Sequence, residues 1–242
     1  MSEATRARRL VAEALGTGVL VATIVGSGIM ASKLTTDFGL MLLGNTIPTG
    51  AILVVLILML GPISGAHFNP AVSLVMATRR KLPWGDFPAF VLAQVAGGIL
   101  GTVIAHLMFD QPVLQVSATA RSGPGQWIAE GVATGGLVLT IMGVLRFRAD
   151  AIAIAVGLYI TAAYWFTSST SFANPAVTVA RSLTGSFAGI APGDVPAFVA
   201  IQAVAAVGVA ALADWLFAEE APVAVPEAAA LDDPGTFQSW GR

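Results

Sequence analysis

Two asparagines, each followed by proline and alanine, are the residues whose types and spacing point most directly to a function. They are Asn69 and Asn174, and they open the tripeptides 69–71 and 174–176. Asparagine is a strong helix N-cap and proline is best tolerated at the first helical position, so each tripeptide predicts the start of a helix. A capping asparagine accepts a backbone N–H with its side-chain oxygen, which leaves its NH2 group to donate to other molecules.

The apolar segments that begin at these asparagines, 69–78 and 174–184, are too short to cross a bilayer. We therefore expect two re-entrant half-helices whose first turns lie inside the membrane. Each helix N-terminus adds roughly half a positive charge. Neutral polar solutes would pass such a site by hydrogen bonding, whereas cations, and protons relayed along a water chain, would meet an electrostatic barrier.

The composition sets the class of protein that must position these asparagines. The chain has 242 residues, of which 56% are hydrophobic and 11% are charged. A soluble domain carries about 25% charged residues, so this composition indicates an integral membrane protein. The chain has no cysteine and only two histidines, from which we expect that it is not an enzyme and that it binds no cofactor or metal. A net charge of −2 gives no basic excess that would suggest a nucleic-acid partner.

Hydropathy and charge predict six membrane-spanning helices. We place them at residues 10–31, 39–61, 86–108, 126–147, 150–168 and 194–217. Arginine and lysine cluster at 6–9, 79–81 and 146–148, which the positive-inside rule assigns to the cytoplasm together with both termini. A channel domain would then occupy residues 1–217, and the acidic segment 218–242, rich in alanine and proline, is predicted to be a disordered cytoplasmic tail.

The chain also repeats itself, in halves at about 10–108 and 126–217. Each half has one acid in its first span and one glutamine in its third. The matching residues are Glu13 with Glu130 and Gln94 with Gln202. Because three spans is an odd number, the second half enters the membrane in the opposite orientation. Inverted repeats of this kind place the functional site near the bilayer midplane.

These residues resemble the aquaporin, or major intrinsic protein, family. The resemblance rests on Ala12-Glu13 followed by Gly16-Thr17, on the run 64–72 around the first asparagine, and on the second Asn-Pro-Ala. It implies an all-α integral membrane fold, with six transmembrane helices and two re-entrant half-helices in inverted repeats that meet at the centre of a pore. It also implies a homotetramer in the lipid bilayer, and we expect a bacterial inner (plasma) membrane location.

Members of this family narrow the pore near the central motif with four residues. A gap-free count from the two asparagines gives Thr49, Ala162, Ser171 and Val177. A shift of one residue would replace Ala162 by Thr161 or Ala163. Members that conduct water or glycerol usually carry arginine at the position of Val177 and an aromatic residue at the position of Thr49. Because both are missing, we predict a wide, uncharged and half-apolar constriction without strict water selectivity.

Four further residues receive supporting roles. Glu13 and Glu130 are expected to brace the re-entrant loops by accepting backbone N–H groups, with direct solute contact as the alternative. The family pattern makes His67 a structural or cytoplasmic-vestibule residue, with gating as the alternative. Arg181 lies four residues beyond Val177 on the same face of the half-helix, so it would carry a displaced charge toward the outer mouth. Alternatively, it snorkels to the interface or pairs with an acid.

A wide filter without arginine resembles that of bacterial aquaglyceroporins linked to arsenic resistance. The resemblance implies a passive channel for small neutral solutes, with arsenite and methylated arsenicals as the favoured cargo. One alternative is a general channel for glycerol, urea, ammonia or water. A structural or adhesion protein with a closed pore is another, although intact asparagines in both halves argue against it.

Overall fold

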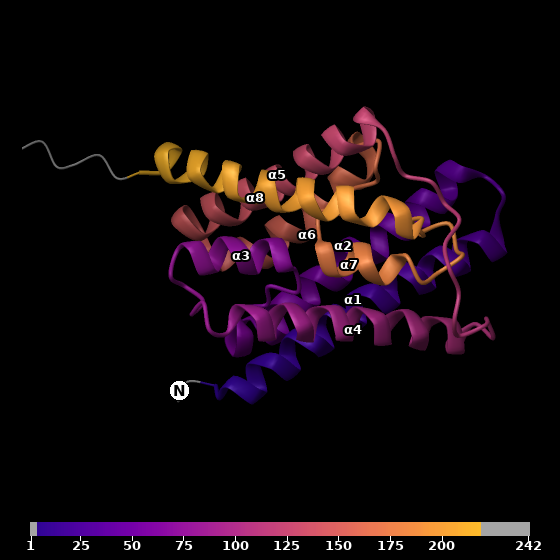
Figure 1. Ribbon diagram of the computed structural model, residues 1–242, viewed down its shortest axis with the longest axis horizontal. Helices are drawn as coiled ribbons and strands as arrows, with labels where there is room; N and C mark the ends of the chain where they lie inside the picture. The colour runs from indigo at the N-terminus through magenta and orange to yellow at the C-terminus, as the bar shows by residue number, and fades with distance from the viewer. Residues whose placement is uncertain (1–3, 219–242) are drawn as a thin grey trace, which may run out of the picture.

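The computed structural model describes residues 4–218, which form a bundle of helices running side by side (Figure 1). The elements in this range are α1 (Arg6–Leu34), α2 (Phe38–Ser64), α3 (Pro70–Thr78), α4 (Phe87–Met108), α5 (Pro124–Phe147), the 3₁₀ helix η1 (Ala149–Ala151), α6 (Ile152–Phe166), α7 (Pro175–Arg181), the 3₁₀ helix η2 (Pro192–Asp194) and α8 (Val195–Leu216). The all-helical fold predicted from the sequence is confirmed.

Within residues 4–218, six helical segments are long and apolar enough to cross a membrane. They are Arg6–Leu34, Phe38–Ser64, Phe87–Met108, Pro124–Phe147, Ala149–Phe166 and Pro192–Leu216. Each coincides with one predicted span and begins or ends within a few residues of it. The predicted acidic tail, apart from Ala218, lies outside the described residues.

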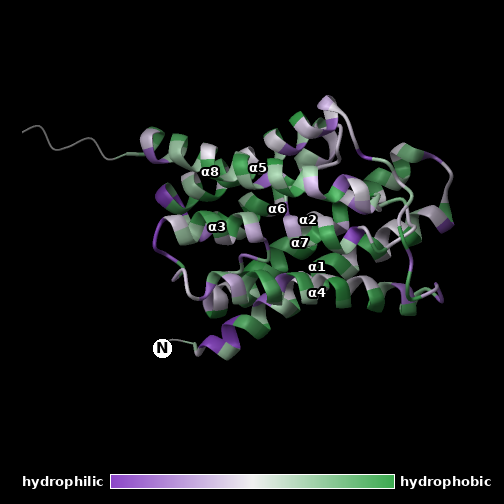
Figure 2. Cartoon of the chain, viewed as in Figure 1, coloured by the Kyte–Doolittle hydropathy of each residue, from purple (hydrophilic) through white to green (hydrophobic). Residues whose placement is uncertain are grey.

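The helices pack as two similar halves. In the first half α1 packs on α4 and α2, and in the second half α5 packs on α8 and α6. The α2–α6 contact joins the halves. Both ends of the described chain lie at the same end of the bundle, at the left of Figure 1. Hydrophilic residues gather near the ends of the helices, and hydrophobic residues dominate their middle turns (Figure 2).

Small residues allow the helices of each pair to approach closely. A Cβ atom added to Gly97 of α4 would lie 2.1 Å from the carbonyl oxygen of Ala14, and one added to Gly101 would lie 2.1 Å from that of Gly18. A Cβ on Gly157 of α6 would likewise meet the backbone of α2. Close backbone approach at small residues is how helices associate in lipid, where no hydrophobic force drives them together.

The half-helices α3 and α7 begin in the middle of the bundle and run toward opposite ends (Figure 1). The side chain of Asn69 caps α3 by accepting the N–H of Ala71. Asn174 caps α7 by accepting the N–H groups of Ala176 and Val177. Proline follows each cap at a position where its missing N–H costs no hydrogen bond. The sequence therefore starts both helices at the depth where the two halves meet.

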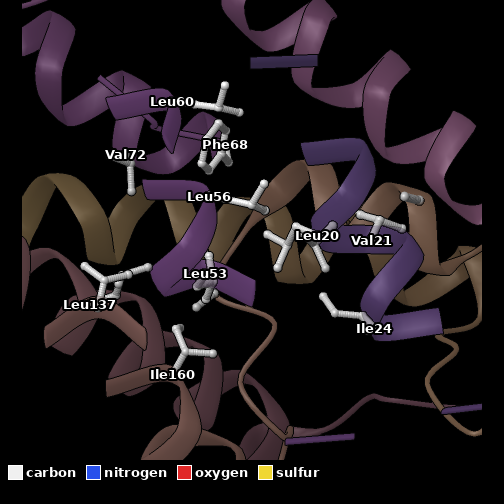
Figure 3. Close-up of a cluster of buried hydrophobic side chains, with 14 of the residues drawn as sticks. Leu20, Val21, Ile24, Leu53, Leu56, Leu60, Phe68, Val72, Leu137 and Ile160 are labelled. Carbon is white, nitrogen blue, oxygen red and sulfur yellow. The ribbon is translucent and has the colours of Figure 1, made fainter. Parts of the chain in front are cut away.

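The apolar core lies between the long helices and the re-entrant segments (Figure 3). Its labelled members are Leu20, Val21, Ile24, Leu53, Leu56, Leu60, Phe68, Val72, Leu137 and Ile160. Other large apolar side chains face outward, among them Leu92, Leu100, Ile128 and Leu158. An exposed apolar surface on every side of a helical bundle is what a bilayer environment requires.

Candidate functional site

A cavity of about 570 Å³ lies between the two halves, bounded by α1, α2, α5, α6 and both re-entrant loops. Asn69 and Asn174 line it together. Arg9, Lys81 and Asp150 also line it. They belong to the first turn of α1, to the segment after α3 and to η1, which lie at the end of the bundle where both ends of the described chain are found (Figure 1). Most of the remaining lining is apolar and includes members of the core in Figure 3, so the cavity has one polar track along otherwise apolar walls.

The two asparagines cross-link the re-entrant loops. Nδ2 of Asn69 donates to the carbonyl oxygen of Ala173 at 2.7 Å, and Nδ2 of Asn174 donates to that of Phe68 at 2.8 Å. An amide NH2 has two N–H donors, so one donor on each asparagine is used inside the protein and one remains. The sequence suggests an NH2 group committed wholly to the lumen. It cannot show this cross-link, because the cross-link depends on two loops more than 100 residues apart being adjacent.

Glu13 holds the first re-entrant loop. Its Oε1 accepts from Ser64 Oγ at 2.6 Å and from the backbone N–H of His67 at 3.0 Å. Its Oε2 accepts from the N–H of Phe68 at 2.7 Å and from Gln94 Nε2 at 2.7 Å. The carboxylate is fully buried and does not line the cavity. These contacts give Glu13 a bracing geometry without solute contact.

Glu130 does the same for the second loop. It accepts the backbone N–H groups of Phe172 and Ala173, each at 2.9 Å, and Gln202 Nε2 at 2.6 Å. Gln202 also donates to Thr178 Oγ1 at 3.0 Å. The two acids therefore occupy equivalent places in the two halves, as their matched positions in the sequence suggest.

Both loops carry strained backbone at equivalent positions. A positive φ near +50° occurs three residues and one residue before each asparagine. The residues are Ala66 (50°), Phe68 (49°), Ser171 (50°) and Ala173 (47°). Non-glycine residues adopt this region uncommonly, and such strain persists only where surrounding contacts over-determine the backbone. The buried carboxylates supply those contacts through the loop N–H groups.

His67 combines a structural contact with a place in the cavity wall. Its Nδ1 lies 3.0 Å from Ser73 Oγ, and its ring centre lies 5.5 Å from that of Phe90. The equivalent residue of the second half, Phe172, packs on Phe198 with ring centres 5.4 Å apart. His67 also lines the cavity beside the first asparagine.

Three of the four predicted constriction residues line the cavity. They are Thr49, Ser171 and Val177. Ala162 does not line it and is exposed on another face of α6, so this placement needs correction. The cavity-lining residues of α6 are Ile152, at its first position, and then Ala153, Val156, Ile160 and Tyr164, which are spaced three or four apart along one helix face. Because Ala162 is two residues from Ile160, it points away, and neither Thr161 nor Ala163 lines the cavity.

Arg181 lies in the cavity wall rather than at a lipid interface. Its side chain is buried, with 1% of the residue exposed. Nε donates to the carbonyl oxygen of Ala188 at 2.5 Å, and the guanidinium carbon lies 3.4 Å from the ring centre of Phe172. Its contacts are therefore with a carbonyl and an aromatic ring, not with an acid. The cavity lining is charged at this point, which differs from the uncharged ring predicted from Val177 alone.

A second arginine, which sequence reasoning did not single out, holds the loops around this region. Arg121 donates from Nε to the carbonyl of Gly189 at 2.8 Å and from Nη1 to that of Ser169 at 3.0 Å. Its guanidinium carbon lies 4.9 Å from the ring centre of Phe172. Arg121 belongs to the segment between α4 and α5, outside the spanning helices, and burial lowers the pKa of its guanidinium. It does not line the cavity.

The described residues contain no cluster of histidine, cysteine and acidic side chains that would hold a metal ion. The cavity wall near the asparagines offers amides, hydroxyls and the guanidinium of Arg181 beside apolar side chains. Such an arrangement can exchange hydrogen bonds with a passing solute.

Comparison with known sequences agrees with this arrangement. A family model described as major intrinsic protein matches residues 1–148. Aquaglyceroporin AqpS of Rhizobium meliloti (strain 1021) is 60% identical over 223 residues, which cover 92% of this chain and 96% of that protein. Nodulin-26 of Glycine max is 35% identical over 143 residues, covering 57% of this chain and 51% of that protein.

A solved structure shares the fold. The aquaglyceroporin from Plasmodium falciparum superimposes with a TM-score of 0.67 over 88% of this chain and 96% of that chain. Its sequence identity to this chain is 23%, so the likeness concerns the arrangement of helices.

Proposed function

Because the chain belongs to the major intrinsic protein family, whose members are membrane channels and not enzymes, we propose that it is a passive channel whose favoured solutes are arsenite and methylated arsenicals. Transport runs down the solute gradient, through the cavity between the two halves. This proposal goes further than the family, which passes small neutral solutes in general.

One observation carries the proposal. The cavity of about 570 Å³ contains both central asparagines, with Val177 and Thr49 in its wall where an arginine and an aromatic residue would narrow it. Thr49 Oγ1 donates to the carbonyl oxygen of Asn45 at 2.8 Å, which leaves its lone pairs to accept from a solute. Val177 supplies an apolar contact. Arsenous acid is a neutral polyol mimic, and in its methylated forms a methyl group replaces a hydroxyl group. The hydroxyl groups of such a solute would contact Thr49, and its methyl group would contact Val177.

Stopped-flow swelling of proteoliposomes tests this cargo directly. Vesicles with and without the purified protein are exposed to gradients of arsenite, methylarsonous acid, glycerol and urea at neutral pH. We expect both arsenicals to enter at least as fast as glycerol. Rapid glycerol and urea entry with background entry of both arsenicals would contradict the cargo and favour a general glycerol or urea channel. Background rates for every solute and for water would favour a closed structural protein.

The assembly and orientation complete the proposal. We expect a homotetramer in the bacterial plasma membrane, with both termini in the cytoplasm. The placement of all three basic segments at one end of the bundle supports the orientation, since short cytoplasmic loops are enriched in lysine and arginine. The apolar outer surfaces of the helices are available for contact with lipid or with other subunits. The mass of the purified protein in nanodiscs would test the tetramer.

A further inference from the structure

We infer that Arg181 and Ser171 form a donor pair that selects solutes carrying two or more oxygen atoms. This inference rests on the proposed channel function and adds a specificity-determining site to it. Arg181, one helical turn beyond Val177, and Ser171, in the loop before α7, supply the hydrogen bonds and the positive charge that Val177 lacks.

The first observation is a pair of buried polar atoms in the cavity wall that lack a partner. Arg181 is 1% exposed and Ser171 is 2% exposed, and both line the cavity. Nη1 of Arg181 and Oγ of Ser171 have no hydrogen-bond partner within residues 4–218. Buried polar groups are nearly always paired, and each unpaired one carries a desolvation cost. A solute in the cavity would pair both atoms.

The second observation is that the surrounding contacts fix both groups. Phe172 follows Ser171 in the chain, and its ring lies under the Arg181 guanidinium. The N–H of Phe172 is held by Glu130 at 2.9 Å. The carbonyl oxygen of Ala188 accepts a hydrogen bond from Nε of Arg181. One ring and one carbonyl therefore hold the guanidinium, and one carboxylate holds the backbone next to Ser171, so little freedom is lost when a solute binds.

The inverted repeat supplies the third observation. Arg181 is the seventh residue after Asn174, and the seventh residue after Asn69 is Met76. Met76 lines the same cavity from the other half. The geometry of the half-helix therefore directs this position to the lumen in both halves. Methionine gives an apolar wall on one side, and arginine gives a charged donor on the other.

This difference decides which solutes the pair recognises. A guanidinium only donates hydrogen bonds, whereas a hydroxyl both donates and accepts. A solute with two oxygens on adjacent atoms can accept from Nη1 of Arg181 while it exchanges a hydrogen bond with Ser171. Urea has one acceptor oxygen, and its NH2 groups only donate. When that oxygen accepts from Arg181, urea can contact Ser171 only by donating an N–H, which leaves the Ser171 hydroxyl proton without an acceptor. Glycerol is therefore a suitable probe for the pair, and urea is the matched comparison.

The test measures the ratio of glycerol to urea permeability in proteoliposomes. We expect Arg181→Met, which copies the residue of the other half, and Ser171→Ala each to lower this ratio about five- to tenfold, the value of one hydrogen bond. Both substitutions reduce the volume of the side chain and would therefore widen the cavity. A merely wider pore would raise the ratio, because glycerol is the larger solute, so the expected fall cannot come from size.

Arg80→Met is the control, because Arg80 is exposed and does not line the cavity. It makes the same chemical change and should leave the ratio unchanged. If the native protein conducts both solutes and the ratio stays constant or rises in Arg181→Met and Ser171→Ala, the donor pair is refuted. Equal loss of both solutes in both variants would assign these residues a structural role and would also refute it. If the native protein conducts neither solute, the channel proposal itself fails.

Discussion

At the residue scale, two buried carboxylates fix the geometry on which permeation depends. Glu13 accepts four hydrogen bonds, two of them from the backbone of the first re-entrant loop. Glu130 accepts three, two of them from the second loop. An acid inside a membrane protein usually marks a substrate or ion pathway. Here both acids are turned away from the cavity, and their effect on solutes is exerted through the loops.

Glu13→Gln is expected to destabilise the protein by about 2–4 kcal/mol, because an amide NH2 would face donors that now have an acceptor. Thermal unfolding of detergent-solubilised protein, followed by tryptophan fluorescence, would measure the loss. Permeability to all solutes should fall together as the loop loses its support. Ser64→Ala removes only one of the four donors and serves as the milder comparison. Unchanged stability in Glu13→Gln would show that the loop does not depend on this carboxylate.

Val177→Arg is expected to reduce permeability to large solutes more than to water, because a guanidinium narrows the cavity and adds a second positive charge beside Arg181. Thr49→Phe should act in the same direction through size alone. Swelling assays with glycerol, arsenite and water in the same vesicles give the comparison. Equal loss for every solute would indicate misfolding, and an unchanged solute profile in both variants would place the constriction elsewhere along the cavity.

At the element scale, the half-helices are held by the long helices, and the long helices approach closely at glycines. The α1–α4 contact at Gly97 leaves no room for a side chain. Since α1 carries Glu13 and α4 carries Gln94, this contact also sets the distance between the acid and the glutamine that donates to it. A change in the spacing between α1 and α4 would therefore also change the hydrogen bond from Gln94 to Glu13, and with it the support of the first re-entrant loop.

Gly97→Ala should lower the free energy of unfolding by about 1–3 kcal/mol, because the added methyl group would overlap the backbone of α1 and force the helices apart. Gly208→Ala is the matched control, since no atom lies within 4 Å of a Cβ added there. It should be neutral or slightly stabilising, as alanine favours helix more than glycine does. Melting temperatures in the same detergent compare the two, and equal shifts would contradict the close-contact explanation.

At the scale of the whole molecule, the inverted repeat places both ends of the described chain, residues 4 and 218, and all three basic segments at one end of the bundle. The opposite end carries the segment between α4 and α5, with Arg121 packed into it. The two ends of the bundle are therefore built from different segments, although the halves that form them are related.

The absence of cysteine allows this orientation to be tested with single-cysteine variants. Gly85 and Ser122 are exposed, on the α3–α4 and α4–α5 segments respectively. In intact cells, a membrane-impermeant maleimide should label Ser122→Cys and should spare Gly85→Cys until the membrane is permeabilised. The reverse pattern would place the termini outside the cytoplasm. Neither substitution changes a charge, so the topology signal itself is kept.

The sequence by itself determined the local features. Six apolar segments, two asparagine caps followed by proline, and matched acids and glutamines could be located because hydropathy, capping and repetition are properties of neighbouring or periodically spaced residues. The gap-free count also selected Thr49, Ser171 and Val177, which line the cavity. Ser171 and Val177 each lie three residues from Asn174, so a short count reaches them.

Only the tertiary structure decided which side chains meet across the two halves. The count failed at Ala162 because the face that α6 turns to the cavity depends on its packing against α2. The donation from each asparagine to the opposite loop, and the burial of Arg181 over Phe172, join residues whose contact no local pattern encodes. Hydrogen bonds and ring contacts act over a few ångströms in space, whereas sequence patterns record distance along the chain.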